Sequence, residues 1–136
     1  VIAVLIRTYS GLKIKFIGKK ELFNPITSFF FKFLGGIPVD RSKNTNIVDE
    51  VVSLFDQKEI EILAIAPEGT RKEVKKWKSG FYYIALNANL PILMVSFDYM
   101  KKEVVIHNKF SPTGDINKDF IELEKKVSDV VSRNRL

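Results

Sequence analysis

The sequence predicts a single α/β domain with a mixed, mostly parallel β-sheet flanked by helices. Strand-type and helix-type apolar segments alternate from end to end of the 136 residues, which is the pattern of α/β domains. The chain is also long enough for one hydrophobic core and too short for two domains of ordinary size. No internal repeat or low-complexity tract interrupts the alternation.

The first half of the chain predicts helix, strand, helix, strand, helix and strand in that order. Residues 1–10 predict the end of a helix that Gly11 terminates, because glycine readily adopts the left-handed conformation found after helices. Lysine and apolar residues alternate in 13–18, which is typical of a half-exposed strand. A short strand, a helix and a strand apolar enough to be central are then predicted in residues 36–40, 46–57 and 61–66.

A helix is predicted between the first two strands, because Asn24 and Pro25 signal its cap and its first position. Its core-facing side is expected to consist of apolar residues at helical spacing, which are Ile26, Phe29, Phe30 and Phe33. Phe31 lies off that side, so we expect it to be exposed and able to touch lipid. In the helix of 46–57, the expected inward residues are Ile47, Val48, Val51, Val52 and Phe55.

The second half predicts a helix in 80–89, a strongly apolar strand in 91–99 and its hairpin partner in 102–110. An amphipathic helix in 117–131 closes the chain. Its expected inward residues are Phe120, Leu123, Val127, Val130 and Val131.

Composition limits the possible chemistry. With 22 Lys plus Arg against 16 Asp plus Glu, the net charge of +6 favours anionic partners. The absence of cysteine excludes a disulfide or a thiol nucleophile, and with His107 as the single histidine we expect no metal and no cofactor. His107 has no Ser or Asp at a suggestive spacing, so we interpret it as structural. No apolar stretch approaches the ~20 residues that span a bilayer.

Two predicted loops that follow strands carry residues suited to an anionic ligand, at the place where α/β sheets usually bind ligands. Arg41 lies in the first loop and Arg71 in the second, and a guanidinium group matches the oxygens of a phosphate. Gly69 allows a close backbone approach, and Thr70 adds a hydroxyl donor. Glu68 is suited to hold the guanidinium groups or to accept a hydrogen bond from a substrate hydroxyl.

Ordinary structural roles explain the same residues. The second loop is compatible with a plain turn in which Gly69 is left-handed and Arg71 is solvated. Arg41 could pair only with Asp40 or Asp49, and the lysines between 72 and 78 are typical of a solvated face.

Three segments, "GGIPVDR" (35–41), "APEGTR" (66–71) and "LPILMV" (90–95), together resemble the glycerolipid acyltransferase family in order and spacing. The resemblance extends through 16–23 and 76–85, and so reaches about residue 110. It implies a glycerol-phosphate acyltransferase-like α/β domain. Such a domain moves an acyl group from acyl-CoA or acyl-carrier protein to the hydroxyl of a lysophospholipid, such as 1-acyl-glycerol-3-phosphate, in phospholipid biosynthesis.

The resemblance also implies roles for individual residues. Those associated with the phosphate and glycerol of the acceptor are Lys20, Arg41, Gly69, Thr70 and Arg71. Glu68 would support that site. Pro91 marks a further block associated with the acyl donor and the core, in which Met94 stands where the family often has a second proline.

One block of the family, His-x4-Asp, does not occur in the sequence. Its histidine is the base that deprotonates the acceptor hydroxyl, and the block precedes a helix like the one expected at the start of this chain. We therefore expect it just upstream of Val1, so that residues 1–136 would be an N-terminally truncated acyltransferase domain that is nearly inactive alone. The alternative is a non-catalytic module of the same fold that binds anionic lipid headgroups.

The expected partners are the acyl donor, the lysophospholipid acceptor and an anionic membrane. Peripheral contact at the cytoplasmic face of the membrane is expected from the basic segment 13–20 and the Phe-rich helix after Asn24. Nucleic acid is not expected as a partner, because the aromatic residues occur mostly at core spacing and no RNA-binding motif is present.

Overall fold

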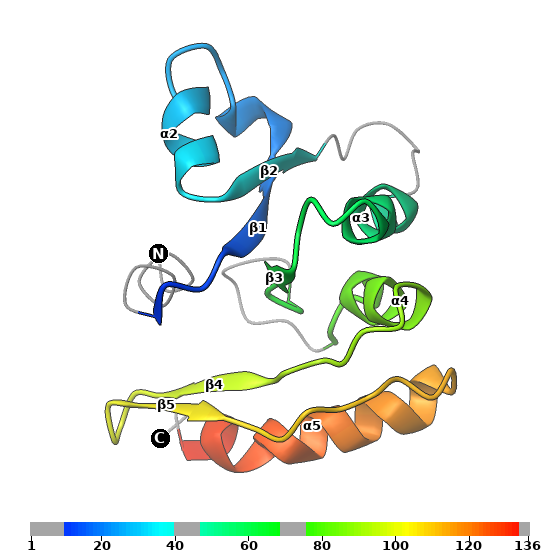
Figure 1. Ribbon diagram of the computed structural model, residues 1–136. Helices are drawn as coiled ribbons and strands as arrows, with labels where there is room; N and C mark the ends of the chain where they lie inside the picture. The colour runs from blue at the N-terminus through cyan, green and yellow to red at the C-terminus, as the bar shows by residue number, and fades with distance from the viewer. Residues whose placement is uncertain (1–9, 40–46, 69–75, 134–136) are drawn as a thin grey trace. The chain divides into compact units, whose positions relative to one another are not determined.

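The computed structural model describes residues 10–39, 47–68 and 76–133, and the contacts divide the chain into two compact units, Val1–Ile84 and Ala85–Leu136 (Figure 1). The first unit contains a parallel three-stranded sheet with helices. The second contains an antiparallel hairpin and a helix. The predicted α/β class with mostly parallel strands is therefore confirmed, with the difference that the parallel and antiparallel pairs of the described residues lie in separate sheets.

The sheet of the first unit has the order β2-β1-β3, formed by β1 (Ile14–Lys19), β2 (Gly36–Val39) and β3 (Ile62–Ala64). Both pairs are parallel. Phe16 of β1 is in register with both neighbouring strands, because it pairs with Gly36 of β2 and with Ala64 of β3.

The middle strand of this sheet is β1, although the sequence predicted that 61–66 would be central. That prediction was wrong. Only three residues of the predicted segment form β3, and Ile62 at its start is 37% exposed. The apolar content of a strand depends on how well its two faces are covered, and it does not indicate how many strands pair with it. The lysine-containing β1 is the middle strand because β2 and β3, which both follow it in the chain, pair with its opposite edges.

The glycine at the first predicted helix end behaves as expected. Ser10 is helical and Gly11 has φ +71°, the left-handed conformation of a helix end. Residues 1–9 of the predicted helix lie outside the described residues.

A single turn of 3₁₀ helix, η1 (Lys20–Leu22), and the short helix α2 (Ser28–Phe33) connect β1 to β2. The helix α2 begins three residues later than predicted, with Thr27 and not Asn24 as its N-cap. Asn24 instead holds the turn before the helix, because its Oδ1 accepts the backbone N–H groups of Ile26 (3.0 Å) and Thr27 (2.9 Å). The turn that begins at Pro25 leads directly into α2.

The predicted orientation of this helical segment was wrong. Its four expected core residues are largely exposed: Ile26 90%, Phe29 82%, Phe30 59% and Phe33 70%. Phe31, expected to be exposed, is half-buried, and its ring centroid lies 5.7 Å from that of Phe23. A helix of six residues has too little length for apolar spacing to define its inward side, so contact with the body of the unit decides it.

The core of the first unit forms around α3 (Ile47–Asp56), which lies within the helix predicted in 46–57. Val51 is fully buried and clusters with Ile60 and with Ile84 of the helix α4 (Gly80–Asn87). Among the predicted inward residues of α3, Ile47, Val48 and Phe55 pack against this cluster, and Val52 is half-buried. The position of α4 agrees with the helix predicted in 80–89.

The second unit contains the predicted hairpin of β4 (Val95–Asp98) and β5 (Glu103–Ile106), extended by a bridge between Ile92 and Phe110. The turn between the strands is held by Asp98, whose Oδ1 accepts the backbone N–H of Lys101 at 3.0 Å.

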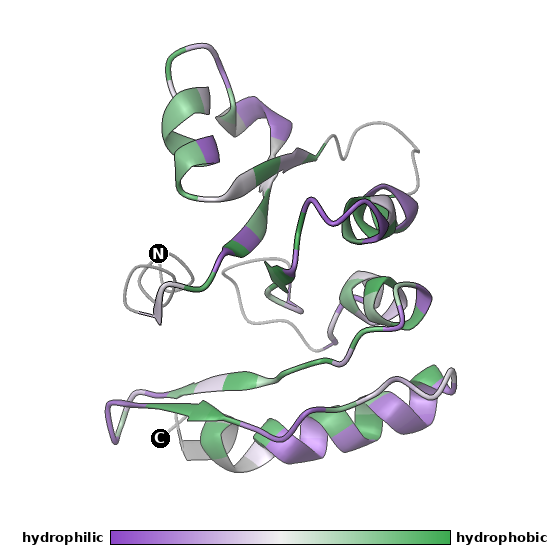
Figure 2. Cartoon of the chain, viewed as in Figure 1, coloured by the Kyte–Doolittle hydropathy of each residue, from purple (hydrophilic) through white to green (hydrophobic). Residues whose placement is uncertain are grey.

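The helix α5 (Ile116–Arg133) packs against β4. Leu123, Val127 and Val130 are buried and Phe120 is half-buried, so these predicted inward residues are confirmed, while the side chain of Val131 lies outside the described part. Hydrophilic residues alternate with hydrophobic ones along the helix (Figure 2). In the described ranges, no helix is both long and apolar enough to cross a membrane.

Candidate functional site

The ends of β1 and β2 form the best-defined part of the candidate site. The two strands are parallel and end side by side, with Lys19 paired to Val39. Lys20 follows at once in η1, and its side chain is exposed. Arg41 follows Val39 by two residues in the sequence and itself lies outside the described residues. The strand pairing therefore brings Lys20 beside the chain that leads to Arg41.

The two glycines of "GGIPVDR" determine how β2 enters the sheet. Gly35 has φ +93°, a conformation that L side chains rarely adopt. A Cβ atom on Gly36 would lie 2.8 Å from the carbonyl oxygen of Phe31 and 2.9 Å from the Cζ atom of Phe23. Both positions therefore require glycine in order to carry the chain from α2 into the strand that ends before Arg41.

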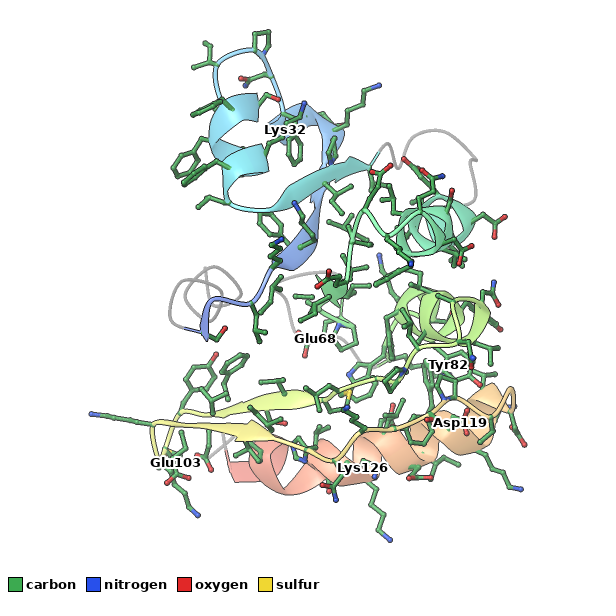
Figure 3. The ribbon with its side chains drawn as sticks, viewed as in Figure 1. Lys32, Glu68, Tyr82, Glu103, Asp119 and Lys126 are labelled. Carbon is green, nitrogen blue, oxygen red and sulfur yellow. The ribbon has the colours of Figure 1, made fainter. Side chains whose placement is uncertain are left out.

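The segment containing Glu68 follows β3. It is closed at its base by a hydrogen bond of 2.9 Å, which the backbone N–H of Lys78 donates to the carbonyl oxygen of Pro67. Glu68, labelled in Figure 3, has an exposed side chain just beyond this closure. Gly69, Thr70 and Arg71, which follow it in the sequence, lie outside the described residues.

The grouping of the predicted site residues stays a prediction, because strand pairing covers only part of it. The end of β3 at Ala64 is level with Phe16, three residues before the end of β1, so strand pairing does not place Glu68 beside Lys20. Pro91 is exposed and belongs to the second unit, just before the bridge of Ile92 with Phe110.

His107 has a partner that the sequence did not indicate. Its Nε2 atom lies 2.8 Å from the Oγ atom of Ser96, which is 8% exposed. Antiparallel pairing of β4 with β5 creates this contact across eleven residues, and the backbone N–H of His107 also donates to the carbonyl oxygen of Met94. The contact links β4 to the residue that follows β5, which suits the structural role expected for His107.

Asp119 is a second polar residue that sequence reasoning missed. It is 3% exposed, and its two carboxylate oxygens accept hydrogen bonds from the backbone N–H and the hydroxyl of Thr113, at 2.7 and 2.8 Å. A signal was available in the sequence, because an acidic residue in the first turn of a helix favours interaction with preceding N–H groups. Among the described residues, no group of three or more His, Asp or Glu side chains is arranged to hold a metal ion.

Comparison with known proteins identifies the family. The model of the Acyltransferase family matches residues 1–98, which include β1, β2, β3, α4 and the segments containing Arg41 and Arg71. No curated protein and no solved structure matches the sequence at a significant level. Because the family model covers well over half of the chain, the chain belongs to the Acyltransferase family.

Proposed function

We propose that this chain is the acceptor-binding part of an O-acyltransferase that acts on a phosphorylated lysolipid, with acyl-CoA or acyl-carrier protein as the donor. The observation that carries the proposal is the placement of two family-like blocks. "GGIPVDR" and "APEGTR" each contain or follow a strand of one parallel sheet, in a chain of the Acyltransferase family.

The chemistry of these segments suits a phosphate group. Lys20 begins η1 beside the chain to Arg41, and a second guanidinium group, that of Arg71, is available after β3. In a partly desolvated site, each charge-assisted hydrogen bond to phosphate contributes about 1.5–3 kcal/mol. Three such contacts would bind a phosphorylated glycerol backbone far better than a neutral one.

The proposed reaction is the transfer of an acyl group from sulfur to oxygen. The acceptor hydroxyl oxygen attacks the thioester carbonyl carbon, the C–O bond forms, and the C–S bond breaks. A base removes the hydroxyl proton, and the thiolate leaving group is protonated. Glu68 is proposed to orient the arginines or the acceptor hydroxyl, and the base is proposed to be the histidine of a His-x4-Asp block.

The assignment of Arg71 predicts a selective loss of acceptor binding. In the enzyme with its natural N-terminal region, Arg71→Ala should raise the KM for the phosphorylated acceptor about tenfold or more, because a contact of roughly 1.5–3 kcal/mol is lost. The KM for the acyl donor should change little. Steady-state kinetics with each substrate varied in turn measure both values.

Lys118→Ala is the matched control for the loss of one positive charge, because Lys118 is an exposed residue of α5. It should leave both constants near their original values. An unchanged acceptor KM in Arg71→Ala would remove Arg71 from the site.

The alternative function is binding of anionic lipid headgroups without catalysis. The two candidates differ in the coding sequence immediately before Val1. A His-x4-Asp block there supports the enzyme, and its loss in the natural protein would support the binding module.

A further inference from the structure

The α2 segment and the turn before it expose four large apolar side chains to solvent. These side chains, which we call the α2 apolar face, are Ile26, Phe29, Phe30 and Phe33, with 59–90% of each side chain exposed. Phe29 and Phe33 stack, with ring centroids 6.5 Å apart. Figure 2 shows α2 as mostly hydrophobic. Four large exposed side chains on one helical segment are unusual, because contiguous exposed apolar patches generally mark interaction sites.

Contacts on the opposite side of α2 and in the turn before it set the orientation of this face. Phe31 points to the other side of α2 and contacts Phe23, and its carbonyl oxygen lies where only a glycine at position 36 leaves room. Asn24 fixes the start of the segment through the N–H groups of Ile26 and Thr27. The aromatic rings of the face are therefore held outward before any partner binds.

Charge identifies the partner that suits the face. Residues 1–39 contain six basic side chains and one acidic one, Glu21, so five of the six net positive charges of the chain lie in this part. Lys32, which is exposed on α2, is the single charged residue between Leu22 and Val39. Exposed apolar rings that share a helix with an exposed lysine, in a part of the chain with a net charge of +5, suit an anionic lipid surface, which has an apolar interior and negatively charged headgroups.

We propose that the α2 apolar face inserts into the interface of an anionic membrane, with Lys32 at the level of the lipid headgroups. Ile26 and Phe29 penetrate the acyl boundary, and Phe30 and Phe33 extend the buried area along the helix. The lysines of 13–20 add attraction to the anionic surface at longer range. This function is separate from acyl transfer, because it places α2 on the lipid and involves no reacting group.

Vesicle sedimentation of the full chain tests the proposal. Phe29→Ser/Phe33→Ser should lower the partition coefficient onto phosphatidylcholine vesicles containing phosphatidylglycerol by about tenfold or more, because two exposed rings no longer enter the lipid. Lys32→Ala should lower it by about fivefold at low salt and by less at high salt. Vesicles of phosphatidylcholine alone should bind the unmodified chain much more weakly.

The matched control is Met100→Ser/Ile121→Ser, which removes two similarly exposed apolar side chains of the second unit. It should change vesicle binding by less than about twofold. Unchanged circular dichroism melting of all variants shows that the effects concern binding. Depth is measured with Phe29→Trp in a Trp77→Phe background, where tryptophan emission should shift to the blue on anionic vesicles.

Equal binding of the Phe29/Phe33 and control double variants would overturn the proposal, as would the absence of the emission shift. A dimer that dissociates in the Phe29/Phe33 variant while vesicle binding persists would overturn it in favour of a second copy of the chain. None of these measurements depends on turnover, so a failure of the proposed acyl transfer would leave the test intact.

Discussion

Gly36 shows how a single residue determines the path of the chain toward the candidate site. The contacts that a Cβ atom would make include backbone as well as the rings of Phe23 and Phe16, so the crowding cannot be relieved by rotating one flexible side chain. Gly35 before it needs positive φ. Steric requirements alone therefore explain the two glycines of "GGIPVDR". Arg41 in the same block has a different proposed role, which is to bind the phosphate of the acceptor.

Gly36→Ala should destabilise the protein by about 1–3 kcal/mol, because overpacking forces the backbone of α2 or β2 to shift. Urea unfolding followed by circular dichroism measures the change. Gly80→Ala is the control, since a Cβ atom there meets nothing within 4 Å in the first position of α4. It should be neutral or stabilising by up to about 1 kcal/mol. Equal effects of the two substitutions would contradict the packing argument.

At the level of single elements, long helices followed the sequence pattern and the short one did not. α5 has eighteen residues, and its buried Leu123, Val127 and Val130 lie at the predicted spacing. α2 has six residues, and the side predicted to be inward is exposed. Several turns of periodic apolar residues define one inward face, but in fewer than two turns one anchoring ring, here Phe31, decides the orientation.

Asp119 of α5 holds the loop that precedes the helix, and this gives a prediction for that element. Asp119→Ala removes the acceptors of two hydrogen bonds from Thr113 in a buried place and should cost about 1–3 kcal/mol of stability. Thermal unfolding measures it. Glu122→Ala, which breaks an exposed ion pair with Lys126, should cost at most about 1 kcal/mol. An Asp119 variant no less stable than the Glu122 variant would show that the carboxylate does not hold the loop.

The whole chain combines a sheet unit that carries the proposed acceptor site with a hairpin and helix unit that carries Pro91 and His107. Its net charge of +6 is concentrated in the first 39 residues, where α2 exposes its apolar face. Family membership rests on residues 1–98 and thus on all of the first unit and the beginning of the second.

The proposed division between binding and catalysis can be tested on the whole chain. If the proposed function holds and its base is the histidine of a His-x4-Asp block, residues 1–136 alone should bind a phosphorylated acceptor, yet turn it over about 10²- to 10⁴-fold more slowly than a protein that includes such a block. Calorimetric titration with lysophosphatidic acid and an assay of thiol release from acyl-CoA measure the two properties. Full activity of residues 1–136 would place the base within this chain.

The sequence by itself determined the α/β class, the inward residues of α3 and α5 and the family-like blocks, because each of these depends on residues close together in the chain. The tertiary structure alone decided that β1 is the middle strand, that α2 faces outward, and that Ser96 meets His107. These features depend on which distant segments of the chain pair and on how their side chains pack together. The spacing of residues within one segment does not determine either. The phosphate site predicted for Arg41 and Arg71 stays a prediction, since it rests on residue chemistry and on resemblance to a family.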